Sequence, residues 1–118
     1  MSQLKNDQTI LKRIETGTHE GDILGFTEDL FSGWLELYKD SRLYLYCLIS
    51  RCKNEGNTQN LLRRWIYEGY EVRIVKPSSI MKHILGKFGY VESYENLSHH
   101  YDYEVEVWRR PFLLPSFE

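Results

Sequence analysis

The sequence has few of the features that mark secreted, fibrous or membrane proteins. It contains two cysteines and three prolines in 118 residues, and no apolar run approaches the length of a membrane-spanning helix. Cys47 and Cys52 lie five positions apart in or beside one expected strand, so their side chains point to opposite faces. The first fourteen residues carry charges in place of the apolar core of a signal peptide. We therefore expect no disulfide, no zinc site and no membrane association, and a cytoplasmic location.

The chain also lacks an excess of charge of one sign. It has 15 basic and 17 acidic side chains and a net charge of −2, so no broad basic field exists to attract nucleic acid. Hydrophobic residues make up 42% and charged residues 27%, as in ordinary globular proteins. This length suits one hydrophobic core, and we expect a single domain.

Hydrophobic periodicity predicts alternating strands and helices after a weakly patterned N-terminal segment. Leu61, Leu62, Trp65 and Ile66 repeat with helical spacing, and Gly69 stands where a helix usually ends. The expected elements are a short helix at 3–15, a loop at 16–25, strands at 33–39 and 42–51, a helix at 57–68, a strand at 70–76, a helix at 78–88, a strand at 90–94, a polar loop at 95–100 and a strand at 101–108. This order predicts an α/β (α+β) fold with a mixed central sheet and two covering helices.

The connection between the second strand and the first long helix is where we expect a ligand. A strand, a helix and a strand joined by short loops form a crossover unit whose two strands are parallel. Ligands of such sheets sit beyond the carboxyl end of a strand, where the opening turn of the next helix offers free N–H groups. In this chain that place is Lys53 to Asn60.

The segment 33–108 resembles the acetyl-CoA-binding core of the GNAT superfamily of N-acetyltransferases. The resemblance rests on the order strand, polar loop, helix with a Leu-Leu pair, strand and helix, and on the closing pair Gly89-Tyr90. The family's loop has a basic or amide residue, two residues, Gly, one residue and a small residue, and here Thr58 replaces the small one. The resemblance implies an acyl-CoA N-acyltransferase-like fold with acetyl-CoA as cosubstrate. The implied cofactor-binding residues are Leu48, Ile49, Ser50, Lys53, Asn54, Glu55, Gly56, Asn57, Thr58, Gln59 and Asn60.

The catalytic residues of the family are only partly kept. Ser78 stands in place of a customary Asn, and Leu85 stands in place of the Tyr that commonly protonates the leaving thiolate. Acyl transfer to an amine needs a base, donors to the thioester carbonyl and an acid. The candidate catalytic residues are Glu36, Tyr46 and Ser50, with Tyr46 or Ser50 as the proton source. A solvated Glu36 and a packed Tyr46 are the ordinary alternatives.

The N-terminal segment 1–32 is shorter than the part that shapes the acceptor pocket in the family. Such compact forms resemble small bacteriophage-encoded acetyltransferase-like proteins. The acceptor side would then be completed by a second subunit of a homodimer or by the C-terminal arm 109–118.

Two functions from different classes follow. The first is transfer of an acetyl group from acetyl-CoA to a primary amine of unknown identity. The alternative is a weakly active or inactive GNAT-fold protein that binds a partner protein, for example a host protein. Adjacent histidines such as His99 and His100 rarely converge on one ion, so we expect no metal.

Overall fold

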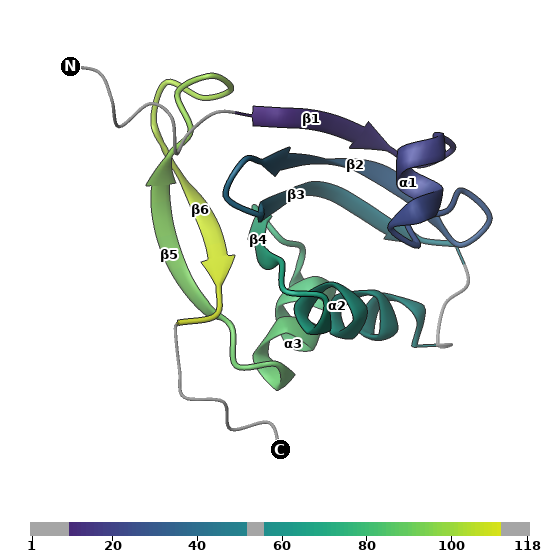
Figure 1. Ribbon diagram of the computed structural model, residues 1–118. Coiled ribbons are helices and arrows are strands. Elements are labelled where there is room, and N and C mark those ends of the chain that lie inside the picture. The colour runs from purple at the N-terminus through teal and green to yellow at the C-terminus, as the bar shows by residue number, and fades with distance from the viewer. Residues whose placement is uncertain (1–9, 52–55, 112–118) are drawn as a thin grey trace. The chain divides into compact units, whose positions relative to one another are not determined.

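The computed structural model describes residues 10–51 and 56–111, which form an α+β fold (Figure 1). The strands are β1 (Ile10–Glu15), β2 (Phe31–Tyr38), β3 (Arg42–Ser50), β4 (Glu71–Val75), β5 (Val91–Asn96) and β6 (Glu104–Arg109). The helices are α1 (His19–Ile23), α2 (Asn57–Tyr67) and α3 (Ser79–Lys87). The strands follow the order β1-β2-β3-β4-β6-β5 in one sheet. The α+β class with a mixed sheet is thereby confirmed.

The chain divides into two compact units, one within Met1–Val72 and the other within Arg73–Glu118. Strand β4 contributes its first residues to one unit and its last to the other, because the division falls inside this strand. The expectation of a single domain with a reduced N-terminal segment stays a prediction.

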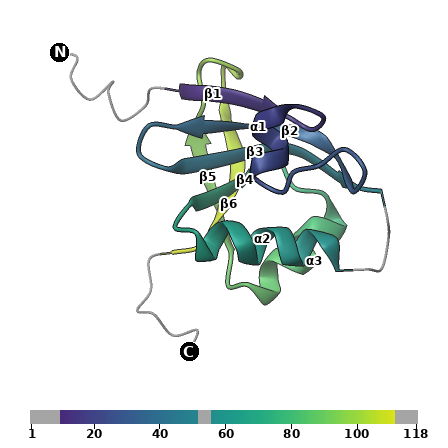
Figure 2. The same ribbon diagram turned by 45° about the vertical axis from the view of Figure 1, so that its right-hand side comes forward.

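The first unit contains an antiparallel meander of β1, β2 and β3 together with α1 and α2 (Figures 1 and 2). The side chains of this unit that are at most 1% exposed include five from β2, β3 and α2: Leu35, Leu43, Leu45, Leu62 and Trp65. The indole Nε1 of Trp65 donates a hydrogen bond to the carbonyl of Leu24 at 2.9 Å. Its ring meets Phe26 edge-on with centroids 5.9 Å apart. The buried indole is thus satisfied, and α2 is fixed to the segment that follows α1.

The second unit contains β6 paired on one side with β4 and on the other with β5, both antiparallel. Val105 and Val107 of β6 are at most 2% exposed, and Leu85 of α3 is fully buried. An ion pair of 2.7 Å joins Arg73 of β4 to Glu95 of β5. Both partners are mostly buried, with side chains 17% and 20% exposed, so the pair is shielded from solvent.

The two longer helices begin and end close to where their periodicity predicts. The hydroxyl of Ser78 accepts the N–H of Met81 at 3.2 Å and caps α3, as expected of a serine at that place. Gly69 and Gly89 follow the two helix ends with φ values of +97° and +81°. No helix in residues 10–51 and 56–111 has the length and apolar composition that spanning a membrane requires.

The N-terminal elements differ from the expectation. The described part of the expected helix at 3–15 is strand β1, because Ile10 to Glu15 pairs with β2 and buries Ile14 to 4% exposure. Six residues, in which Lys12 and Arg13 separate two apolar residues from Ile14, carry too little pattern to distinguish helix from strand. The expected loop at 16–25 contains α1, which the hydroxyl of Thr18 caps by accepting the N–H of Gly21 at 3.0 Å.

Candidate functional site

Strand β3 carries an extra residue opposite β2, and that residue is Tyr46. Trp34 of β2 pairs with Cys47, but the next residue, Leu35, pairs with Leu45. This irregularity is a β-bulge, and bulges commonly turn a side chain away from the direction that regular alternation gives. The Tyr46 hydroxyl donates a hydrogen bond to Oε1 of Glu36 at 2.9 Å. The structure therefore brings together two of the three candidate catalytic residues.

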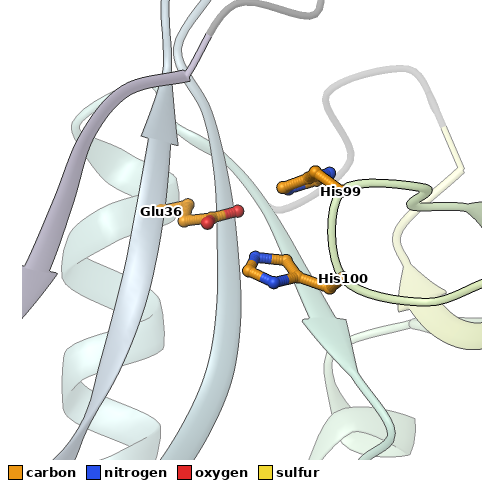
Figure 3. Close-up of side chains that lie close together, drawn as sticks. All are labelled: Glu36, His99 and His100. Carbon is orange, nitrogen blue, oxygen red and sulfur yellow. The ribbon is translucent and has the colours of Figure 1, made fainter.

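Glu36 projects from β2 as a buried carboxylate (Figure 3). It is 4% exposed, which contradicts the alternative of a solvated strand residue. Its cross-strand neighbours are Arg13 of β1 and Tyr44 of β3. The ring of Tyr38 lies next to that of Tyr44, with centroids 5.0 Å apart. A carboxylate this deep requires hydrogen-bond partners, and the Tyr46 hydroxyl is one.

A stack of flat groups extends from Tyr46 across the meander. The rings of Tyr46 and Trp34 are parallel within 1° with centroids 4.3 Å apart. The guanidinium carbon of Arg13 lies 3.9 Å from the centroid of Trp34, and Nε of Arg13 bonds Glu15 at 3.1 Å. Cation–π and ring stacking together hold the phenol of Tyr46 in place beside Glu36.

The carboxylate environment keeps two tyrosines protonated. Burial raises the pKa of Tyr46, and the charge of Glu36 and its hydrogen bond raise it further. Burial also raises the pKa of Tyr38, with the Glu36 charge as the next cause. Tyr46 is therefore a neutral hydrogen-bond donor across the physiological pH range.

The proposed cofactor slot begins at the carboxyl end of β3. Ser50 and Leu48 are half-buried and Ile49 is 59% exposed. Ser50 pairs with Phe31 of β2. Lys53, Asn54 and Glu55 lie outside the described residues.

Helix α2 opens with a left-handed glycine and a turn of free N–H groups. Gly56 is the N-cap at φ +71°, and the helix has no side-chain cap hydrogen bond. The first helical bond runs from the N–H of Asn60 to the carbonyl of Gly56 at 3.0 Å, leaving the N–H groups of Asn57, Thr58 and Gln59 without intrahelical acceptors. The Nδ2 atom of Asn57 is buried, and no described residue is its hydrogen-bond partner. Thr58 is 9% exposed and therefore belongs largely to the core.

Other residues considered from the sequence have structural roles. Leu85 is fully buried and packs in the second unit. Nη2 of Arg64 donates to the carbonyl of Ile23 at 2.6 Å, so this arginine ties α2 to α1. His99 and His100 lie between β5 and β6 with rings 4.1 Å apart (Figure 3). The expectation of no metal stays a prediction.

Sequence patterns missed the aromatic surroundings of Glu36. Trp34, Tyr38 and Tyr44 looked like ordinary packing or interface residues, and Arg13 fell in a segment expected to be helical. Counting pairs outward from a two-residue Asp40-Ser41 turn puts Leu45 opposite Glu36, whereas the structure pairs Glu36 with Tyr44. No feature of the sequence predicts the β-bulge that places Tyr46 beside Glu36.

Comparison of the chain with protein-family models, with curated proteins and with solved structures found no match.

Proposed function

We propose that this chain is a GNAT-like N-acetyltransferase that moves an acetyl group from acetyl-CoA to a primary amine. The observation that carries the proposal is the 2.9 Å hydrogen bond between Tyr46 and Glu36 on the strands that lead to the start of α2. A buried carboxylate bonded to a neutral phenol supplies both a proton acceptor and a proton donor. The element order, a hairpin followed by helix, strand, helix and two strands, agrees with the resemblance seen in the sequence.

The proposed reaction forms one bond and breaks one bond. The amine nitrogen attacks the thioester carbonyl carbon, the C–N bond forms, and the C–S bond breaks as the thiolate departs. One proton must leave the nitrogen, and one must reach the sulfur. In this proposal Glu36 takes the first and Tyr46 gives the second.

The hydrogen bond between Tyr46 and Glu36 also provides a path for the proton that restores both residues after the reaction. The negative charge of Glu36 contributes to holding the proton on Tyr46, so protonation of Glu36 removes one reason for the raised pKa of the phenol. Proton uptake by Glu36 therefore makes proton release by Tyr46 easier. After transfer, the proton on Glu36 moves to the tyrosinate along the same hydrogen bond, and both residues regain their starting states.

In the proposal the cofactor lies between the end of β3 and the start of α2. The free N–H groups of Asn57 to Gln59 suit the pyrophosphate, since a helix N-terminus carries partial positive charge. The buried Nδ2 of Asn57 is a further donor without an acceptor in the described residues. The main chain of Leu48 to Ser50 would run beside the pantetheine arm.

The test is a free-thiol release assay with acetyl-CoA and a panel of amines that includes polyamines, lysine peptides, aminoglycosides and nucleobases. Glu36→Gln and Tyr46→Phe should each lower amine-dependent release by about 10²-fold to 10⁴-fold, the usual contribution of a positioned acid or base. Tyr67→Phe is the matched control, because Tyr67 is 91% exposed on α2, and its activity should equal that of the unmodified chain. Full activity in Tyr46→Phe would contradict the proposed roles.

A separate variant tests the binding of acetyl-CoA. Gly56→Asp should abolish acetyl-CoA binding measured by calorimetry, because it adds a negative charge at the N-cap of α2, where the pyrophosphate would lie. Gly56→Asn is the control, since asparagine tolerates this conformation without the charge.

The second candidate function is binding of a partner protein by a chain that no longer catalyses acetyl transfer. The full burial of Leu85, in the place where the resemblance puts a tyrosine acid, favours it. Acetyl-CoA binding without thiol release for any amine would support this candidate, and amine-dependent release would exclude it.

A further inference from the structure

Strand β5 presents an open hydrogen-bonding edge. It stands last in the strand order, so among the described residues no strand pairs with its outer side. Such an edge holds backbone N–H and C=O groups that another strand can use. Which peptide groups face outward follows from the bonds of its neighbour, β6.

The direction of each peptide group on β6 is fixed by contacts on both sides. The N–H of Lys76 donates to the carbonyl of Glu106 at 2.9 Å, so the peptide groups of Glu106 face β4. Those of Val107 face β5 instead, because backbone direction alternates along a strand. The hydroxyl of Ser93 on β5 donates a hydrogen bond to the Val107 carbonyl at 2.7 Å, which agrees with this carbonyl facing β5.

The same alternation decides which residues of β5 bond to β6 and which face the open edge. Ser93 pairs with Val107 and Glu95 pairs with Val105, and these residues bond to β6. The intervening residues, Glu92, Tyr94 and Asn96, direct their N–H and C=O groups to the open edge. Their side chains also share one face of the sheet, since they are two positions apart.

That face is acidic and aromatic. Glu92, Tyr94 and Asn96 are opposite Trp108, Glu106 and Glu104 of β6, in that order. The ring of Tyr94 is 57% exposed, and its hydroxyl donates to Glu92 at 2.6 Å. The indole of Trp108 donates to Glu106 at 2.6 Å. Carboxylates and aromatic rings side by side are suited to cations.

The protein already places one ammonium group on this face. Nζ of Lys82 in α3 lies 3.1 Å from Oε2 of Glu106 and 5.9 Å from the ring of Trp108. Glu92, Glu104 and Tyr94 are exposed further along the same face. The charge that would complement them is positive.

We propose that the open edge of β5 binds an extended peptide segment that carries Lys or Arg at alternate positions. The segment adds to β5 as a further strand, with main-chain bonds to Glu92, Tyr94 and Asn96. Its basic side chains, which fall on one face at every second residue, meet the carboxylates and rings. A second copy of this chain fits less well, because pairing two β5 edges would bring two sets of Glu92, Glu104 and Glu106 onto one face.

The decisive measurement is residue-resolved amide exchange on the full chain, with and without an acetylated peptide of about eight alternating Lys and Thr residues. The peptide should slow exchange at the amides of Glu92, Tyr94 and Asn96, and leave Ser93 and Glu95 unchanged because they already bond to β6. An alternating Glu and Thr peptide is the control and should change none. Binding of the basic peptide without slower exchange at the three outward amides would overturn strand addition.

Variants test the same edge by fluorescence anisotropy with the labelled basic peptide. Tyr94→Pro removes one outward N–H and spares the bonds to β6, so proline is acceptable there. It should weaken binding at least about tenfold beyond Tyr94→Ala, which removes only the side chain. Glu92→Lys should weaken binding at least as much, by charge reversal. Equal affinity in Tyr94→Pro and Tyr94→Ala, no binding at about 1 mM protein, or a self-associated chain that excludes the peptide would each contradict the proposal.

Discussion

At the scale of single residues, the buried carboxylate of Glu36 ties stability to pH through its tyrosines. The pKa values of Tyr38 and Tyr46 are raised in the folded protein, whereas a tyrosine in the unfolded chain has a pKa of about 10. Their contribution to stability is fully present below about pH 10. Above it the unfolded state loses protons that the folded state keeps, so the free energy of unfolding falls as pH rises.

We therefore expect the denaturant midpoint to drop between about pH 9 and pH 11. Tyr46→Phe removes one of the two groups and should make the drop shallower, although it also removes the bond to Glu36 at every pH. The slope against pH, not the absolute midpoint, is the quantity to compare. Identical slopes in the two proteins would show that Tyr46 has no raised pKa.

The identities of the site residues could be foreseen better than their geometry. Glu36 and Tyr46 are candidates from their residue types and positions on the hairpin. Their bond depends on a bulge at one position of β3, and the cost of moving a bulge by a residue is set by neighbours that the local sequence does not specify. Ser50, a candidate on the same grounds, lies opposite Phe31, four positions further along β3 than Tyr46.

At the scale of elements, the close approach of β2 and β3 depends on Gly33. A Cβ atom on Gly33 would collide with the carbonyl oxygen of Cys47, which is main chain and has little freedom to move, and its φ is +156°. Gly33→Ala should lower the free energy of unfolding by about 1 to 3 kcal/mol, the usual range for backbone strain. The measurement is urea unfolding followed by circular dichroism.

Gly86 supplies the matched control for that substitution. It lies in α3, and a Cβ atom there would meet nothing within 4 Å. Gly86→Ala should therefore raise the free energy of unfolding by roughly 0.5 to 1 kcal/mol, since alanine favours the helix. An unchanged stability in Gly33→Ala would mean that β2 and β3 are further apart than the structure has them.

Helices were easier to predict than the N-terminal strand. In α2, Leu61, Leu62 and Trp65 recur with helical spacing and are all buried, so local pattern and tertiary packing agree. In β1, one buried isoleucine is the main internal signal, and the pairing of this strand with β2 depends on residues 19 to 28 positions away. Such long-range pairing overrides weak local preference.

At the scale of the whole molecule, the net charge does not show where the charged side chains lie. The net charge of −2 indicated only that no broad basic field exists to attract nucleic acid. In the second unit, however, Glu92, Glu104 and Glu106 share one face of the β5–β6 pair. Register across a hairpin determines that grouping, and composition carries no information about register.

The two proposed sites share no residue and lie in different units, so their ligands should leave separate footprints. Acetyl-CoA at about 100 times its Kd should stabilise the chain by about 2.7 kcal/mol and slow amide exchange at the end of β3 and in the first turn of α2. The basic peptide should slow exchange only at Glu92, Tyr94 and Asn96. Gly56→Asp should erase the first footprint and keep the second, while Tyr94→Pro should do the reverse. If acetyl-CoA slowed exchange at the outward amides of β5, the separation of the two sites would be wrong, and loss of both footprints in a folded Gly56→Asp protein would show that they are coupled.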